Sequence, residues 1–352
     1  MDTAILGLHH LTATVTAPQE DLDFYTGLLG LRLVKKTVNF DNLRVYHFYY
    51  GDERGAPGTI MTTLPYGALG VRVGVKGAGQ VTVTSFSVPR GSLGYWRDRL
   101  AAQGTAPREE ETAFGDVSLV VEDPSSLVVA LVEADDARAG WTGGGVAADA
   151  AIRGLHSVTL TIREPERTLA LLTGELGFTI AAAAGGRTRV AAGGAAEAGR
   201  LLDIEHSPDA PDAINGLGTV HHVALAIQNE GAQLALRDRL IELGYDVTEV
   251  RDRKYFRSIY FREPGGVLYE VATMGPGFTV DESADWLGQE LKLPPWEEAA
   301  RASIEAALPR VTHGGAGRRA DTRAETGGPP TGADRAPADT RDGPSAGRGP
   351  EH

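Results

Sequence analysis

Apolar and polar positions follow the same plan in four segments of the chain. Each segment opens with apolar and small residues in the period-two pattern of a strand, and apolar residues at helical spacing follow it, as Leu22, Tyr25 and Leu29 do in the first segment. The predicted strands cover residues 8–16, 81–88, 155–162 and 220–227. The predicted helices cover residues 18–29, about 93–100, 165–176 and 232–243.

Each predicted helix stops at a glycine, and these glycines give the length of the repeat. They lie 74, 73 and 67 residues apart, at Gly30, Gly104, Gly177 and Gly244. The second and fourth segments also close alike, with a turn and a final strand over 123–130 and 263–270. Such self-similarity is typical of a repeated structural unit. We therefore predict an α+β fold with four βαβββ modules between about residues 5 and 275.

The composition of the connecting segments predicts the domain boundaries. A Gly/Ala-rich linker at 140–151 separates a first domain over 5–139, with modules one and two, from a second domain over 152–280, with modules three and four. A helical extension over 281–312 follows. Residues 313–352 contain no Ile, Leu, Val, Met, Phe, Trp or Tyr. They cannot offset their ordering entropy by burial, which predicts a disordered C-terminal tail.

Charge and composition narrow the class of partner. The 352 residues carry a formal net charge of −13, which argues against binding to nucleic acid or an anionic membrane and favours a small molecule. The chain has no cysteine, which excludes disulfides, thiolate metal ligands and a cysteine nucleophile and fits a reducing compartment. No run reaches the roughly 18 apolar residues of a membrane span, and the first residues lack a signal-peptide pattern. We expect a cytoplasmic protein.

Candidate chemistry stands at the start of two opening strands. The dipeptides His9-His10 and His221-His222 open the strands of modules one and four, and Glu270 lies in the last strand of module four. Two imidazoles and one carboxylate form the ligand set of a non-haem metal site with open coordination positions. The alternative for each residue alone is a buried polar side chain that backbone groups satisfy at a strand end.

Alignment of the four opening strands tests the metal hypothesis. When the strands are aligned on their last apolar residue, His10 and His222 share a column with Val83 and Ser157. Modules two and three therefore lack the histidine. This asymmetry predicts one metal site per chain, at the place where modules one and four face each other.

The closing strands give the same asymmetry. Glu270 corresponds to Ala130 in module two, and module one closes near 61–63 with no ligand suited to a hard divalent metal. The corresponding position in module three is left open between Asp203 and Glu205.

Together these motifs resemble the vicinal oxygen chelate superfamily, and more narrowly its hydroquinone-type ring-cleaving dioxygenases. The resemblance rests on the module plan and on three strings: GLHHLT at 7–12, the pair at 221–222 before VALA, and PGGVLYE at 264–270. It extends from about residue 5 to about residue 310, including LGQELKLP at 287–294. The combination of motifs carries the resemblance, because no single motif is specific.

The resemblance implies an enzyme that opens an aromatic diol with iron(II) and dioxygen. It implies His10, His222 and Glu270 as metal ligands, with manganese(II) as the alternative metal because this ligand set accepts either. The partners would be a small aromatic substrate and O2, while the oligomeric state is left open, with a homo-oligomer as one alternative. Four further residues are implied in the pocket or around the ligands: His9, Thr12, His221 and Tyr260.

Strand geometry tests these four residues. Thr12 lies two positions after a ligand and so shares its face of the strand. His9 and His221 are neighbours of ligands and would point away on a regular strand, so either the strands are irregular there or these histidines orient the ligands from behind. Tyr260 would face Glu270 if the intervening loop has three residues.

One departure from the family pattern concerns a positive charge. Asp252-Arg253-Lys254 runs directly into Tyr255-Phe256, whereas the family pattern has an extra residue or two and an arginine between the two strings. We expect Lys254 or Arg257 to supply that charge.

Two other functions remain as alternatives at this point. A glyoxalase-type lyase or isomerase would use the same fold and a metal, but it would generally need a fourth protein ligand. A non-catalytic protein that binds or sequesters an aromatic compound would need no ligand triad.

Overall fold

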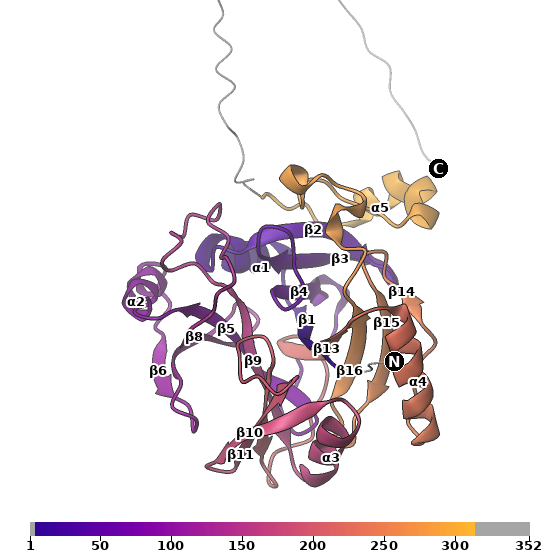
Figure 1. Ribbon diagram of the computed structural model, residues 1–352. Helices are drawn as coiled ribbons and strands as arrows, with labels where there is room; N and C mark the ends of the chain where they lie inside the picture. The colour runs from indigo at the N-terminus through magenta and orange to yellow at the C-terminus, as the bar shows by residue number, and fades with distance from the viewer. Residues whose placement is uncertain (1–3, 314–352) are drawn as a thin grey trace, which may run out of the picture. The chain divides into compact units, whose positions relative to one another are not determined.

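Two curled eight-stranded sheets form the body of the protein (Figure 1). The computed structural model describes residues 4–313. The first sheet has the order β14-β15-β16-β13-β1-β4-β3-β2, and the second has the order β10-β11-β12-β9-β5-β8-β7-β6. The strands of the first sheet are β1 (Gly7–Val15), β2 (Arg32–Asn39), β3 (Asn42–Gly51), β4 (Ile60–Pro65), β13 (Thr219–Ile227), β14 (Arg251–Asp252), β15 (Arg257–Arg262) and β16 (Leu268–Thr273). Those of the second are β5 (Gln80–Pro89), β6 (Arg108–Glu111), β7 (Val117–Glu122), β8 (Val128–Ala134), β9 (Gly154–Ile162), β10 (Phe178–Ala184), β11 (Arg187–Ala192) and β12 (Leu201–His206).

The four predicted modules are confirmed. Each consists of an opening strand, a helix and three further strands, and each helix lies where the apolar stripe predicts it. The helices are α1 (Pro18–Leu22), which continues as a π-helix over Asp23–Leu28, α2 (Leu93–Ala102), α3 (Glu166–Gly174) and α4 (Glu230–Glu242). The predicted α+β fold class is therefore correct.

Each sheet combines two modules that are not joined directly in one predicted domain. Modules one and four share the first sheet, which we call the first half-barrel, and modules two and three share the second half-barrel. The domains predicted over 5–139 and 152–280 thus each contribute strands to both sheets. The opening strands pair antiparallel, β1 with β13 and β5 with β9. All four opening strands carry the same apolar pattern, so the pattern alone does not determine which two become neighbours.

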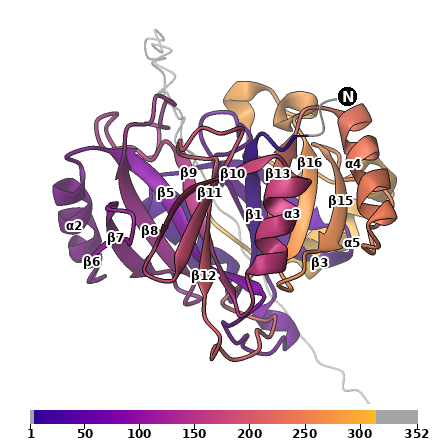
Figure 2. The same ribbon diagram turned by 60° about the horizontal axis from the view of Figure 1, so that its bottom comes forward.

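The half-barrels share one apolar core, and the predicted linker packs against it. Leu11 and Leu225 of the first half-barrel belong to the same buried cluster as Leu160 of the second, and Figure 2 shows the two sets of strands beside each other. In the linker, Val146 is buried, and the indole N–H of Trp96 donates to the linker carbonyl of residue 150 at 2.9 Å. The 140–151 segment is therefore a packed connection.

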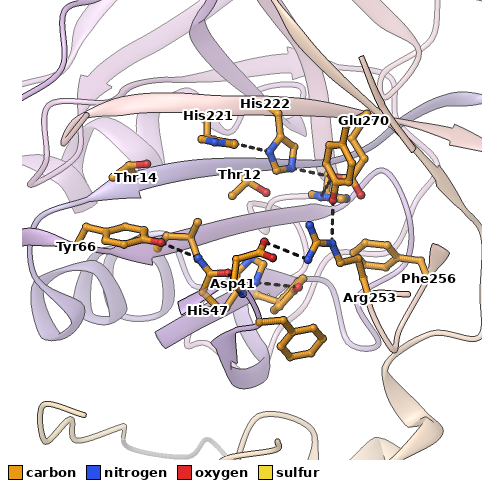
Figure 3. A pocket seen from close by; sticks show the side chains of 16 residues that line it. Thr12, Thr14, Asp41, His47, Tyr66, His221, His222, Arg253, Phe256 and Glu270 are labelled. Carbon is orange, nitrogen blue, oxygen red and sulfur yellow. Dashed lines mark hydrogen bonds and ion pairs between the residues drawn. The ribbon is translucent and has the colours of Figure 1, made fainter. Parts of the chain in front are cut away.

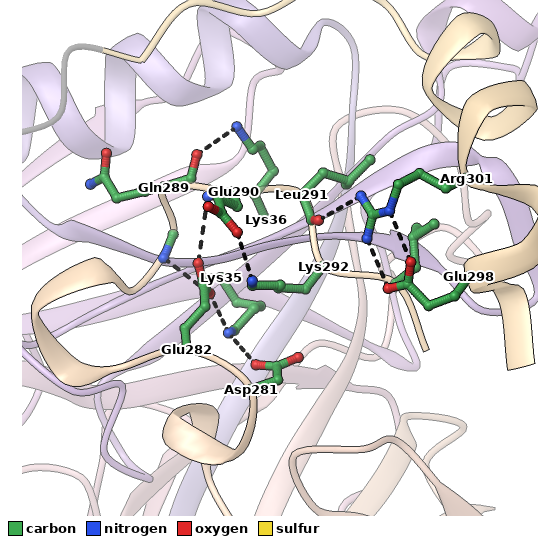
Figure 4. Close-up of polar contacts among 12 residues, drawn as sticks. Lys35, Lys36, Asp281, Glu282, Gln289, Glu290, Leu291, Lys292, Glu298 and Arg301 are labelled. Atoms are coloured by element: carbon green, nitrogen blue, oxygen red, sulfur yellow. Dashed lines mark hydrogen bonds and ion pairs between the residues drawn. The ribbon is translucent and has the colours of Figure 1, made fainter. Parts of the chain in front are cut away.

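The C-terminal extension is attached to module one through a buried lysine. Short 3-10 turns (Phe278–Val280, Ala284–Trp286 and Pro295–Ala300) lead to α5 (Arg301–Ala307), so only part of the predicted helical extension is helical. The ammonium of Lys35 on β2 is completely buried and donates to Glu282 and, at 2.6 Å, to Asp281 (Figure 4). The tail predicted over 313–352 lies outside the described residues except for His313. No helix within 4–313 is long and apolar enough to cross a membrane.

Candidate metal centre

The three predicted ligands lie together on neighbouring strands. His10 comes from β1, His222 from β13 and Glu270 from β16, which is paired with β13. The Nε2 atom of His222 lies 2.8 Å from Oε2 of Glu270, and Nε2 of His10 lies 3.4 Å from the same oxygen. One ligand atom from each residue falls within 4.8 Å of the others, and all three side chains are buried. The opening strands of modules one and four thus bring the set together as the repeat predicted.

The polar atoms of this cluster fit a divalent cation. Nε2 of His222 and Oε2 of Glu270 are buried, and neither makes a hydrogen bond of normal geometry although they face each other. Ser258 donates to the other carboxylate oxygen, Oε1. Burial alone would raise the pKa of Glu270, but His10 and His222 outweigh it and hold that pKa well below its ordinary value. An ionised carboxylate with one oxygen anchored and the other free suits Fe, Mn or Zn in the 2+ state.

His9 fixes the tautomer of the ligand beside it. Its Nε2 lies 3.2 Å from the Thr273 carbonyl, which can only accept, so Nε2 carries a hydrogen. Burial lowers the pKa of His9 to about 3, so the ring is neutral and its Nδ1 accepts from Nδ1–H of His10 at 2.9 Å. The Nε2 lone pair of His10 is then directed at the cluster, which is the tautomer that a metal ligand requires.

His221 repeats this arrangement in module four. Its Nδ1 lies 2.8 Å from Nδ1 of His222, which leaves Nε2 of His222 for the cluster. Both supporting histidines sit on strand irregularities. On β1 the register moves from Leu8 directly to His10, and on β13 it moves from His222 directly to Val220. Each supporting histidine is therefore the extra residue of a β-bulge, which turns its ring beside that of the ligand.

A cavity of about 260 Å³ opens from the three ligands (Figure 3). Thr12 lies in it on the ligand side of β1, as the pleat predicts. Tyr260 is directly opposite Glu270, so the predicted three-residue loop gives the correct register. Aromatic and polar side chains make up the rest of the wall apart from Leu64: Thr14, Asn39, Phe40, Asp41, His47, Tyr49, Tyr66, His221, Arg253 and Phe256.

The positive charge in the cavity is Arg253, which corrects the expectation of Lys254 or Arg257. Nε of Arg253 donates to the Tyr260 hydroxyl at 3.1 Å. Lys254 instead forms an ion pair with Asp281 at 2.6 Å, and Arg257 pairs with an exposed glutamate on α4. The chain turns at Lys254, whose φ is +69°, so the strand alternation that would have identified the inward residue is broken there.

Asp41 and His47 are wall residues that the sequence did not predict. Asp41, in the turn between β2 and β3, binds Arg253 across the cavity with an Nη1–Oδ2 distance of 3.3 Å. His47 on β3 hydrogen-bonds both Tyr49 and Thr62. The repeat could have predicted His47. Tyr49 is the module-one counterpart of Tyr260, and His47 lies two residues before Tyr49 on the same face of the strand.

The second half-barrel holds an arginine where the first would hold a metal. Asp203 pairs in register with Thr159, as Glu270 does with Ala224, so Asp203 rather than Glu205 is the counterpart of Glu270. Arg189 lies opposite Asp203 and binds both of its carboxylate oxygens at 2.7 and 2.8 Å. Its Nη1 also contacts Asp116 at 2.7 Å.

Comparison with known families agrees with this architecture. The model described as Glyoxalase/Bleomycin resistance protein/Dioxygenase superfamily matches residues 7–131 and 154–271. The chain belongs to this superfamily. Each matched range begins at an opening strand and spans two consecutive modules, one and two or three and four. The sheets combine the modules differently, one with four and two with three.

Individual relatives in the superfamily are similar over nearly their whole length. "Putative ring-cleaving dioxygenase MhqE" of Bacillus subtilis is 43% identical over 308 residues, covering 87% of this chain and 99% of that protein. "Chlorohydroquinone/hydroquinone 1,2-dioxygenase" of Sphingobium indicum is 36% identical over 305 residues, covering 85% and 94%. A crystal structure of a "putative dioxygenase" from Bacillus subtilis superposes with a TM-score of 0.84 at 41% identity, covering 88% and 98%. Glyoxalase I of Zea mays shares the fold, with a TM-score of 0.57 at 16% identity, covering 76% of this chain and 92% of that chain.

Proposed function

We propose that the protein is an iron(II)-dependent ring-cleaving dioxygenase that opens a hydroquinone-type aromatic diol with O2. The observation that carries the proposal is the buried cluster of His10, His222 and Glu270 with free ligand atoms, at the end of a cavity walled by aromatic side chains. The names of the relatives support the reaction type. Iron rather than manganese follows from the family resemblance, because the ligand set accepts both.

The fourth position of the cluster favours a dioxygenase over a glyoxalase-type lyase. Thr62 pairs with Thr12 in the register in which Glu270 pairs with Ala224, so Thr62 occupies the place of a fourth ligand. A neutral threonine hydroxyl is a poor ligand for a divalent metal. Three protein ligands leave about three open positions on an octahedral ion, enough for a bidentate reactant and dioxygen.

The metal would be held by Nε2 of both histidines and by Oε2 of Glu270. When bound, iron(II) supplies a redox-active centre that lowers the pKa of a diol hydroxyl and holds the two reactants side by side. Arg253 provides a fixed positive charge in the cavity for the ionised substrate oxygen. Burial raises the pKa of Tyr260, so its phenol stays protonated while its oxygen accepts from Arg253.

Of the two supporting histidines, His221 is the one that can contact the substrate. Both ring nitrogens of His9 are occupied, whereas His221 lines the cavity. With Nε2 of His222 on the metal, Nδ1–H of His222 donates to Nδ1 of His221. Desolvation lowers the pKa of His221 to about 4, so the neutral ring carries its hydrogen on Nε2 and serves as a donor to the substrate.

The test measures iron content and oxygen uptake on protein purified without air. We expect about one iron per chain, and oxygen uptake that depends on hydroquinone or methylhydroquinone more than on catechol. Glu270→Gln should lose both iron and oxygen uptake. The matched control is Asp203→Asn, which changes the counterpart residue in the second half-barrel and should keep both. A Glu270→Gln variant with full activity, or an iron-loaded wild type that consumes no oxygen with any of these diols, would contradict the proposal.

A further inference from the structure

A chain of hydrogen bonds runs beside the cavity from β3 through β4 to β1, and we call it the hydroxyl relay. It consists of Tyr49, His47, Thr62 and Thr12. The Tyr49 hydroxyl lies 3.1 Å from Nδ1 of His47, and Nε2 of His47 lies 2.9 Å from Oγ1 of Thr62. The Thr62 hydroxyl in turn donates to Oγ1 of Thr12 at 2.8 Å. Tyr49, Thr62 and Thr12 are buried, and His47 is half-buried in the cavity wall.

The relay has a single direction. A hydroxyl has one hydrogen, and Thr62 gives its hydrogen to Thr12, so Thr62 must accept from Nε2–H of His47. A neutral imidazole has one N–H, so Nδ1 of His47 accepts from the Tyr49 hydroxyl. Burial, reinforced by His10, lowers the pKa of His47 well below its ordinary value, which keeps the ring neutral. Every donor therefore points towards Thr12.

The relay ends on a hydroxyl that has a hydrogen to give. Because Oγ1 of Thr12 accepts from Thr62, its own hydrogen must find another acceptor, and residues 4–313 supply none. Thr12 is the register partner of the ligand His222 and lines the cavity. The unused hydrogen is thus available beside the metal ligands, where a substrate oxygen would bind.

The second half-barrel shows that the fold does not need these polar residues. Its strands put Val120, Ser118, Ala130 and Ser85 at the positions of Tyr49, His47, Thr62 and Thr12 respectively. Valine and alanine have no polar side-chain atoms, so no relay can form there, yet the sheet has the same strand order and register. The relay occurs in the half-barrel that carries the ligand set, which links it to the site rather than to folding.

We propose that the hydroxyl relay orients Thr12 as a hydrogen-bond donor to the substrate oxygen that binds beside the metal ligands, with His47 and Thr62 as positioning residues. This inference rests on the proposed function, since it assigns the contact partner of an aromatic diol. Without Thr62, the Thr12 hydroxyl can rotate and lose its fixed orientation. The relay therefore contributes to substrate affinity through the orientation of the Thr12 hydroxyl.

The experiment measures the anaerobic Kd of hydroquinone for iron(II)-loaded protein, together with kcat/KM for oxygen uptake. Thr62→Val should keep its iron but bind hydroquinone about fivefold to tenfold more weakly, the effect of one hydrogen bond. His47→Leu should act in the same direction. In a Thr12→Val background, Thr62→Val should have no further effect, because both changes remove the same contact. Thr12→Ser, which keeps the hydroxyl, should retain most of the affinity.

A matched control and two contrary outcomes complete the test. Ser85→Ala, at the Thr12 position of the second half-barrel, should leave Kd unchanged. If Thr62→Val binds hydroquinone as the wild type does, or if its effect adds fully to that of Thr12→Val, the relay is overturned while the proposed function stands. If iron-loaded wild type neither binds hydroquinone nor consumes oxygen with it, the proposed function is wrong, and so is the role of the relay in binding an aromatic diol.

Discussion

The tautomer that His9 imposes on His10 should be measurable as metal affinity. We consider His9→Leu, which removes the acceptor 2.9 Å from Nδ1–H of His10. In the metal-free variant, the His10 hydrogen can move to Nε2, which lies 3.4 Å from Glu270 and can donate to it. In the metal-bound variant that move is blocked, so Nδ1–H of His10 stays buried without a partner. The penalty therefore falls on the bound state.

The size of the penalty on metal binding in His9→Leu follows from the cost of a buried donor without an acceptor. Such a group costs about 1–3 kcal/mol, and loss of a residue that orients a metal-bound histidine typically costs about 10–100-fold in affinity. A 10–100-fold loss of affinity corresponds to about 1.4–2.7 kcal/mol of binding free energy at 25 °C, which lies within the range for the unpaired donor. His9→Asn should recover part of this loss, because the side-chain carbonyl of asparagine can accept from His10.

The assay is an anaerobic titration of the apoprotein with iron(II) in competition with a coloured chelator. The matched control is His156→Leu. His156 is the bulged histidine of module three and hydrogen-bonds Ser157 at 3.0 Å, so its loss removes a comparable buried ring without touching the ligands. We expect wild-type affinity from this control. If His9→Leu binds iron within threefold of the wild type, or if both variants weaken iron binding equally, His9 does not set the tautomer of His10.

Two further predictions concern stability. Burial raises the pKa of Asp21 from 3.8 to about 7 in the folded state. The folded protein therefore holds this proton more tightly than the unfolded chain does. As pH rises from about 4 to about 7, the free energy of unfolding of the apoprotein should fall by at most about 4 kcal/mol. In urea titrations Asp21→Asn should remove most of that slope, and an unchanged slope would contradict the assignment. Lys35→Met leaves the buried Glu282 without its cation and removes one of the two cations of Asp281, which keeps Lys254. The free energy of unfolding should fall by about 3–5 kcal/mol, seen as faster hydrogen exchange over 281–308. The control Lys36→Met removes one hydrogen bond, from Nζ to the Gln289 carbonyl at 3.3 Å, and should lower the free energy of unfolding by about 1 kcal/mol. Equal losses of stability in the two variants would contradict the role given to Lys35.

The repeat made most of the fold and the ligand set predictable. Helix and strand positions followed from periodicity, and the asymmetry between His10 and Val83 located the site between modules one and four. The asymmetry indicated that modules one and four face each other, but it did not show that their opening strands pair within one sheet, because the four opening strands present the same apolar pattern. Two modules joined in sequence could have shared a sheet with equal burial.

The cavity wall was less predictable than the ligands. Strand alternation identified Thr12 and Tyr260 because both lie on regular segments. It failed for His9 and His221, which occupy bulges, and for Arg253, whose direction depends on the left-handed residue that follows it. Bulges and left-handed turns break the period on which such reasoning depends.

The arginine at the centre of the second half-barrel has a consequence for the loss and return of a metal in the first. The positive charge there is covalently part of the chain, held by Asp203 and Asp116, so it cannot be lost to a chelator or to oxidation. Loss of a bound metal would remove a cation from the first half-barrel, while the second half-barrel, which shares its apolar core, keeps its charge balance. The second half-barrel can thus stay folded when the metal leaves the first, so that the empty site can bind a metal again.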